Sequence, residues 1–387
     1  MEHLDLQLPY DGLLLKQYLK TFLYFLSGAN QIWNGDRVTI EANHLLDPLS
    51  NAVRLAQQRL QDSRGVEIPQ SGNDKKKLNV LYRALGVKSS SQTLVRDSLS
   101  AYLNQLKTSG IEEMATALGA WNDGYERDAQ IAPIDPIEIF RAERYEYGRS
   151  QGYAGKRDKR ITLGPHSTML GLTGYILSKQ KSKIMINKGK REFWTSIVIP
   201  NDPRLRSRTL DATLYEAHLR GMNDIYSEGI PGVANNEALS LWLGWLWRKS
   251  AELPEEFANV TIYLIQEPGG NKPAYVRAEH SLNVSQFAKI AKHIEDSPSE
   301  ASARNYQKLL KEALVSKSPE QNFASKVCRL AYLAIVGTVE PEELVYVASR
   351  ESVVGLAAHS KIPRMRKVAG KVALDISSAI EDAKRVG

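Results

Sequence analysis

The chain has 387 residues, a formal net charge of +7 and a hydrophobic content of 42%. These values are typical of a globular protein and exclude a disordered chain, a collagen-like rod and a coiled-coil rod. The single cysteine, Cys328, cannot form a disulfide within the chain, which indicates a reducing compartment, so we expect a cytoplasmic protein.

We expect no membrane segment. The apolar stretch at residues 13–26 is interrupted by Lys16, Gln17 and Lys20 and is shorter than a bilayer requires. The first residues also lack the positively charged region of a signal peptide.

The first third of the chain is predicted to be mostly helical, with one short strand at residues 37–41. Residues 63–77 are polar and contain glycine and proline, so they are predicted to form a loop. The predicted helices cover residues 13–26, 47–61, 78–85, 93–107 and 111–121.

The middle third is predicted to mix strands and helices. Strands are expected at residues 161–177, 182–187 and 193–199, which are rich in Ile, Val and Thr, and residues 260–265 and 274–278 are expected to form a hairpin. Helices are expected at residues 210–226 and 236–251. The three tryptophans of the second helix, Trp242, Trp245 and Trp247, are more typical of a core or of a subunit interface than of a ligand site.

From residue 281 the pattern becomes purely helical, with short polar breaks typical of an antiparallel bundle. The predicted helices cover residues 284–295, 300–315, 321–336, 341–357 and 364–384. The fold class is therefore α+β, a mixed α/β N-terminal body followed by a C-terminal antiparallel helical bundle. We divide the chain into a mostly helical region (1–135), a basic α/β region that binds nucleic acid (136–280) and the bundle (281–387). Truncation near residue 280 is expected to leave a soluble N-terminal body.

The positive charge is concentrated in one block. Residues 141–208 contain 16 Lys and Arg against 5 Asp and Glu, a local net charge of +11, so the remainder of the chain carries 7 − 11 = −4. Such a block is typical of a polyanion-binding surface, although it also fits a solvated surface that only aids solubility. Aromatic residues lie among the cations: Tyr145, Tyr147, Tyr153, Tyr175, Phe193 and Trp194. Aromatic side chains beside Lys and Arg are suited to stacking on unpaired bases.

Lysines alternate at the end of the apolar stretch, at Lys179, Lys181 and Lys183. A strand would place all three on one face, where they could follow a phosphate backbone. We therefore predict nucleic-acid contacts, for DNA or RNA, in the basic block. The residues expected there are Arg149, Gln151, Lys156, Arg157, Lys159, Arg160, Lys179, Lys181, Lys183, Asn187, Lys188, Lys190 and Arg191.

No motif for catalysis or for a metal is present. The sequence has no P-loop, no G-x-G-x-x-G, no H-E-x-x-H and no cysteine pair. Cys328 lies among apolar residues and is predicted to be a buried, inert thiol. We therefore expect no catalytic residue, no metal and no cofactor, and hence a protein that is not an enzyme. Asp202, Asp211 and Asp224 leave a metal-dependent nuclease open, although their spacing matches no motif.

This basic chain without catalytic motifs, with a mixed body and a C-terminal helical bundle, resembles the large subunit of a type I CRISPR Cascade effector complex, of the compact kind found in the I-A and I-B branches. The resemblance is architectural and covers most of the chain. It implies partners: a guide RNA, target DNA, the backbone, guide 5′-end-binding and small subunits, and a helicase–nuclease or other effector recruited on target binding. It also implies recognition of the protospacer-adjacent motif, opening of the duplex and stabilisation of the R-loop.

The resemblance gives roles to particular residues. Lys156, Arg157, Lys159 and Arg160 would hold duplex phosphates, and Gln151, Asn187 and Lys188 would stand in loops that read the motif. A second basic stripe in the bundle would bind the displaced single strand, through Lys361, Arg364, Arg366, Lys367 and Lys371. Two other functional hypotheses remain open: an RNA-binding ribonucleoprotein scaffold, and a metal-dependent nuclease of a mobile element.

Overall fold

The chain folds into two compact units in a computed structural model. Unit 1 contains Met1–Leu210 and Thr261–His280, and unit 2 contains Asp211–Val260 and Ser281–Gly387. The structure describes residues 1–9, 13–26, 28–62, 72–87, 95–118, 121–122, 125–126, 134–141, 162–179, 183–187, 190–200, 236–248, 259–268, 274–315, 319–350 and 362–386. Within these ranges, no helix combines the length and the hydropathy that a membrane crossing requires.

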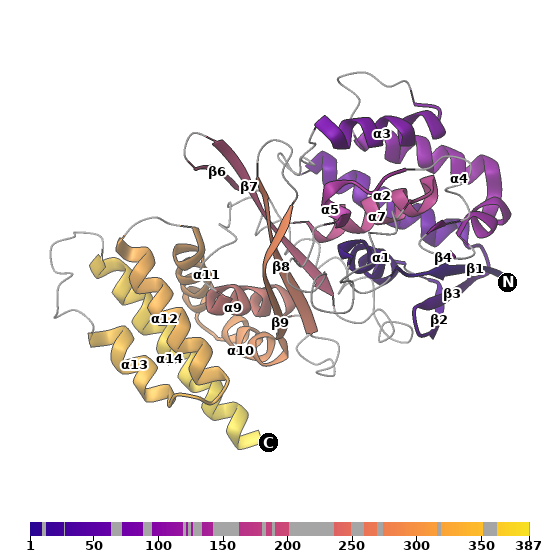
Figure 1. Cartoon of the computed structure of the whole chain (residues 1–387). Coiled ribbons are helices and arrows are strands. Elements are labelled where there is room, and N and C mark those ends of the chain that lie inside the picture. Colours follow the sequence, from indigo (N-terminus) through magenta and orange to yellow (C-terminus); the bar gives the residue numbers. More distant parts are fainter. Residues whose placement is uncertain are drawn as a thin grey trace. The chain divides into compact units, whose positions relative to one another are not determined.

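Unit 1 begins with a three-stranded antiparallel sheet (Figure 1) of β1 (Glu2–Gln7), β2 (Asn30–Asn34) and β3 (Arg37–Ala42), in the order β1-β3-β2. The predicted strand at residues 37–41 is confirmed as β3. One face of the sheet is buried, because Leu4, Leu6, Val38 and Ile40 alternate with polar residues along β1 and β3. Asp5 lies on the other face, where it accepts hydrogen bonds from Thr39 Oγ1 at 2.6 Å and from Arg37.

Six helices of unit 1 lie in the described ranges: α1 (Leu14–Tyr24), α2 (Leu46–Asp62), α3 (Gly72–Ala84), α4 (Val95–Leu118), α5 (Glu138–Arg141) and α7 (Pro165–Ser178). The predicted helices at residues 13–26 and 47–61 are confirmed as α1 and α2. The predicted loop at 63–77 is wrong from Gly72 onward, where α3 begins. Residues 93–107 and 111–121 were expected to form two helices, but α4 runs through Gly110 to Leu118.

The predicted strand at residues 161–177 is wrong, because this segment forms the helix α7. All 14 residues of α7 are buried, so the helix has no polar face and its sequence lacks the 3.6-residue period of an exposed helix. The glycines of this stretch allow close packing against α1. A Cβ atom at Gly174 would lie 1.8 Å from the backbone oxygen of Tyr18, so only glycine fits at this crossing.

A second sheet follows, formed by β6 (Lys183–Asn187), β7 (Lys190–Pro200), β8 (Asn259–Pro268) and β9 (Tyr275–Asn283), in the order β6-β7-β8-β9. The predicted strands at residues 182–187 and 193–199 are confirmed, and β8 and β9 are neighbours as predicted for residues 260–265 and 274–278. A pair of two-residue strands, β4 (Trp121–Asn122) and β5 (Tyr125–Glu126), completes the β structure of the described residues.

The helices of the described part of unit 2 (Figure 1) are α9 (Asn236–Trp247), α10 (Ser285–Asp296), α11 (Glu300–Val315), α12 (Pro319–Ile335), α13 (Pro341–Arg350) and α14 (Ile362–Val386). These confirm the predicted C-terminal helices, and with the sheets of unit 1 they confirm the α+β class. Residues 351–357 of the helix predicted at 341–357 and the whole helix predicted at 210–226 lie outside the described residues.

α9 precedes β8 in the sequence but packs against α10, α11 and α12 in unit 2. Trp242, Trp245 and Trp247 are each no more than 5% exposed, which confirms their prediction as core residues. At Gly244 a Cβ atom would lie 2.3 Å from Phe287 Cβ and 2.6 Å from its carbonyl carbon. The helical cluster therefore includes a segment that sequence order alone would assign to the body.

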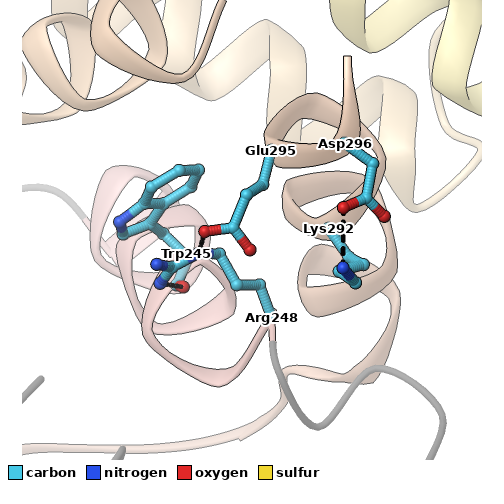
Figure 2. A network of polar contacts seen from close by, with 5 residues as sticks. All are labelled: Trp245, Arg248, Lys292, Glu295 and Asp296. Carbon is cyan, nitrogen blue, oxygen red and sulfur yellow. Dashed lines mark hydrogen bonds and ion pairs between the residues drawn. The ribbon is translucent and has the colours of Figure 1, made fainter. Parts of the chain in front are cut away.

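A network of polar contacts joins α9 to α10 (Figure 2). Arg248, just after α9, forms an ion pair with Glu295 of α10 at 2.8 Å, and its guanidinium lies 4.1 Å from the ring centroid of Trp245. Its Nη1 donates a hydrogen bond to the Trp245 carbonyl at 2.7 Å. Beside it, Lys292 and Asp296 pair within α10 at 2.7 Å. The pairing across the two helices supplements the apolar packing of α9.

Candidate nucleic-acid interface

The structure describes part of the predicted interface. Lys179, Lys183, Asn187, Lys190 and Arg191 lie in or beside the strands of the second sheet, and Arg364, Arg366 and Lys367 lie in α14. The remaining predicted residues lie outside the described residues: Arg149, Gln151, Lys156, Arg157, Lys159, Arg160, Lys181, Lys188 and Lys361. Their roles stay predictions.

The β6–β7 pair brings three of the predicted residues to one face. In its antiparallel register, Lys183 lies opposite Trp194 and Asn187 lies opposite Lys190. Directly opposite residues share a face, and positions alternate along a strand. Lys183, Met185 and Asn187 of β6 therefore share one face of the hairpin with Lys190, Glu192 and Trp194 of β7.

The other face of β7 is the one that packs inward. Thr195, Ile197 and Ile199 are buried and occupy the alternate positions of the strand. Arg191, which is opposite Ile186 in the register, belongs to this second face. The register thus separates Arg191 from Lys183 and Lys190. The face of these two lysines also carries the acidic residue Glu192 and the aromatic residue Trp194.

The base of this hairpin is held by a buried arginine of α2. Arg59, 3% exposed, donates from Nη1 to the Leu177 carbonyl at 2.6 Å and from Nη2 to the Lys179 carbonyl at 2.7 Å. Both carbonyls belong to the C-terminal end of α7, where the helix dipole favours a positive charge. Lys179 in turn forms an antiparallel bridge with Ile197 of β7. Arg59 therefore ties together α2, the end of α7 and β7 at the point where the hairpin begins.

The prediction for Lys179 is corrected by the structure. We expected this residue on an exposed strand face with Lys181 and Lys183. Its side chain is completely buried, and its Nζ lies 5.4 Å from the ring centroid of Tyr175. The end of α7 packs into the interior of unit 1, so the alternation of lysines does not begin at this residue. We leave Lys179 out of the proposed interface.

A second cationic surface lies on α14. Lys367 and Lys371 are exposed and stand four residues apart, so they share one side of the helix, and Arg366 is half-buried. Met365, Val368, Val372 and Ile376 are buried and form the opposite, core-facing side. Arg364 lies in the first turn of α14.

The described interior holds several buried polar and titratable groups. Among the described residues, no three side chains of His, Cys, Asp or Glu are gathered so that they could hold a metal ion. Cys328 is buried as predicted, and burial raises the pKa of its thiol. Burial likewise raises the pKa of Tyr306, a fully buried residue of the same cluster.

His166 is also buried and forms a hydrogen bond of 3.0 Å between its Nδ1 and the hydroxyl of Tyr102. Sequence reasoning missed both this pair and Arg59. Arginine at a single position of an amphipathic helix gives no signal that distinguishes a buried cation from an exposed one.

Comparison with known proteins shows that the chain is a CRISPR-associated protein. It belongs to the family of the CRISPR-associated protein CsaX, whose family model matches residues 38–352. No curated protein matches the chain. Membership of this family confirms the CRISPR association expected from the resemblance and implies work with other CRISPR components.

Proposed function

We propose that the chain is a non-catalytic, nucleic-acid-binding subunit of a multi-protein, RNA-guided complex that targets DNA in the cytoplasm. The family supports the CRISPR context. The charge distribution supports the binding role, because residues 141–208 carry a net charge of +11 while the rest of the chain is slightly acidic. Within the complex, we propose that the subunit recognises the protospacer-adjacent motif and stabilises the R-loop, as a Cascade large subunit does.

The observation that carries this proposal is the face of the β6–β7 hairpin. Lys183 and Lys190 share it with Asn187, Trp194, Met185 and Glu192, so this face carries two cations against one carboxylate. Two cations suit phosphate contacts, an amide side chain suits the hydrogen-bonding edge of a base, and an indole suits stacking on an unpaired base. Arg59 bonds to the carbonyls of Leu177 and Lys179, just before the hairpin in the sequence.

The first test measures binding of the full chain to labelled duplex DNA, single-stranded DNA and RNA over a range of salt concentrations. Two variants are compared with the natural chain: K183A/K190A on the hairpin and K156A/R157A/K159A/R160A in the segment before α7. Each lost phosphate contact lowers the salt slope, the dependence of log K on log salt concentration, by about 0.9 for duplex DNA. We therefore expect weaker binding to all sequences and a flatter salt dependence.

The matched control is K75A/K76A, which removes two exposed lysines of α3 in the same unit. It should leave affinity and salt slope unchanged. If the hairpin variant and this control behave alike, the hairpin is not part of the interface.

The choice of nucleic acid and the non-catalytic role are tested in the same preparation. A Cascade-type subunit is expected to bind DNA weakly alone and to gain sequence specificity only with its partner proteins and guide RNA. Strong preference for RNA in the absence of partners would favour the ribonucleoprotein scaffold. Shortening of the DNA in the presence of Mg²⁺ or Mn²⁺ would favour a nuclease.

A further inference from the structure

The N-terminal sheet has one edge that is chemically unlike the others. In the order β1-β3-β2, the strand β2 (Asn30–Asn34) pairs only with β3. Within the described residues, no strand pairs with the outer edge of β2. Such an edge presents backbone N–H and C=O groups to which another strand can add.

The register identifies which backbone groups point outward. β2 and β3 are joined by Gly35 and Asp36, and the closing pair of the hairpin is Asn34 with Arg37. In a two-residue hairpin the closing pair exchanges hydrogen bonds, and bonded and non-bonded pairs then alternate. The backbone groups of Asn30, Ile32 and Asn34 therefore face β3, and those of Gln31 and Trp33 face the outer edge.

This edge lacks the charges with which proteins usually protect edge strands. The opposite edge strand, β1, carries Glu2 and Asp5, and the edge strand of the second sheet, β6, carries Lys183. β2 has the sequence Asn-Gln-Ile-Trp-Asn, without a charged residue or a proline. Ile32 at its centre is 50% exposed. Nothing in β2 itself opposes the addition of a strand.

Two polar side-chain atoms of the same strand also lack a partner. Gln31 Oε1 and Trp33 Nε1 are buried with no hydrogen-bond partner, although Gln31 Nε2 donates to the Leu23 carbonyl at 2.8 Å. These residues occupy alternate positions and so share the inner face of the sheet. Both atoms are already covered on this inner face, so an added strand would meet the outward backbone groups of Gln31 and Trp33 instead.

We propose that the outer edge of β2 receives an extended segment of a partner protein from the same CRISPR assembly, which adds a strand to the N-terminal sheet. An extended strand is the occupant because the outward N–H and C=O groups of Gln31 and Trp33 stand two residues apart, the spacing at which a neighbouring strand offers acceptors and donors. The proposal is independent of the nucleic-acid interface, since β2 lies outside the basic block.

A second copy of the chain is the less suitable occupant. β2 has five residues, and at about 3.3 Å per residue its edge is too short to bury the roughly 800 Å² per partner of a stable interface. A segment of a subunit that is already bound elsewhere in the complex acts at a high effective concentration and does not need that area.

Amide hydrogen exchange tests the proposal, measured on the full chain alone and after assembly with the other proteins encoded in its CRISPR locus. The amides of Gln31 and Trp33 should exchange rapidly in the free chain and slow by about tenfold or more on assembly. The amides of Ile32 and Asn34, which already bond to β3, should change little. Unchanged exchange at Gln31 and Trp33 in the assembled complex would overturn the proposal. Slow exchange in the free chain that depends on its concentration, with a dimer in sedimentation, would also overturn it in favour of a second copy.

Two variants of the edge complete the test. Ile32→Lys places on β2 the kind of charge that β1 and β6 carry, and Trp33→Pro removes an outward N–H; each should weaken retention of the chain in the assembly by about tenfold or more. The control Val336→Lys changes a 40% exposed apolar residue of unit 2 in the same way and should leave retention unchanged. Nucleic-acid affinity of free Ile32→Lys should equal that of the natural chain, so the result does not depend on the proposed function. Normal retention of a folded Ile32→Lys chain would refute the role of this edge.

Discussion

Removal of the C-terminal helices is predicted to expose the apolar surface of α9. The fragment of residues 1–280 keeps α9 but loses α10, α11 and α12, against which α9 packs. Five apolar side chains of α9 are at most 5% exposed: Leu241, Trp242, Leu243, Trp245 and Trp247. At about 1.5–3 kcal/mol for each large apolar side chain, the lost burial is on the order of 10 kcal/mol.

That free energy is comparable to the whole stability of a typical domain, about 5–15 kcal/mol. The structure therefore replaces the expectation of a soluble N-terminal body. We predict that the 1–280 fragment aggregates, or binds a dye that reports exposed apolar surface, while unit 1 keeps its own secondary structure.

The assay compares soluble yield, sedimentation and dye binding for two fragments. The first is residues 1–280 unchanged, and the second has the same ends with the five α9 residues changed to Gln or Ser. Recovery of a soluble monomer only in the second fragment would assign the defect to α9. A soluble, monomeric first fragment without dye binding would refute the reasoning, because it would mean that α9 does not depend on unit 2.

Three further predictions concern unit 1. Gly174→Ala should lower the free energy of unfolding by about 1–3 kcal/mol or more, because the new Cβ would meet the Tyr18 backbone. The control in unit 2 is Gly370→Ala, where the nearest atom to the new Cβ is Ser349 Oγ at 3.7 Å. This control should be neutral or stabilising in thermal and denaturant unfolding. Arg59→Ala should lower the denaturation midpoint more than Arg59→Lys does. Lys keeps one cationic donor group for the two carbonyls that Arg59 reaches, whereas Ala keeps none. Equal midpoints for the two variants would contradict this. Hydrogen bonds from Thr39 and Arg37 lower the pKa of Asp5, so its stabilising contribution is present above the unfolded pKa and is lost as the pH falls through the folded value. Asp5→Asn should therefore lose less stability on acidification below about pH 4 than the natural chain, measured by unfolding at a series of pH values.

The C-terminal helices were predictable because each has one buried and one solvated side. In α10, for example, Phe287, Ile290 and Ile294 are buried while Lys289 and Lys292 reach solvent. This pattern repeats every 3.6 residues and can be seen in any single sequence. The strand β3 was predictable for the related reason that apolar and polar residues alternate along it, and β6 and β7 were predictable from their content of Ile, Val and Thr.

The failures have equally specific causes. α7 is buried on all sides, so its apolar and β-branched residues give no helical period. β1 and β2 were missed because short edge strands with polar outer positions resemble loops in a sequence. The placement of α9 in unit 2 depends on contacts with helices more than 30 residues away in the sequence, such as that of Gly244 with Phe287, and no local pattern encodes such a contact.

The same limit applies to the charge that led to the candidate interface. Counting Lys and Arg treats every cation as exposed, yet three cations of unit 1 are internal. Lys16 is buried and pairs with Asp36 at 2.7 Å, Arg59 binds the end of α7, and Lys179 is fully buried beside Tyr175. The charge that a nucleic acid meets is therefore smaller than the sequence total.

This distinction gives a last prediction, because buried and exposed lysines should affect different measurements. Lys179→Met should change the denaturation midpoint and leave the salt slope of nucleic-acid binding unaltered, since no phosphate contact is lost. K183A/K190A should leave the midpoint nearly unchanged and reduce the slope by up to about 0.9 for each lost contact with duplex DNA. A reduced slope for a folded Lys179→Met chain would show that Lys179 reaches the nucleic acid in the complex. The original prediction, that Lys179, Lys181 and Lys183 lie on one strand face of the interface, would then hold.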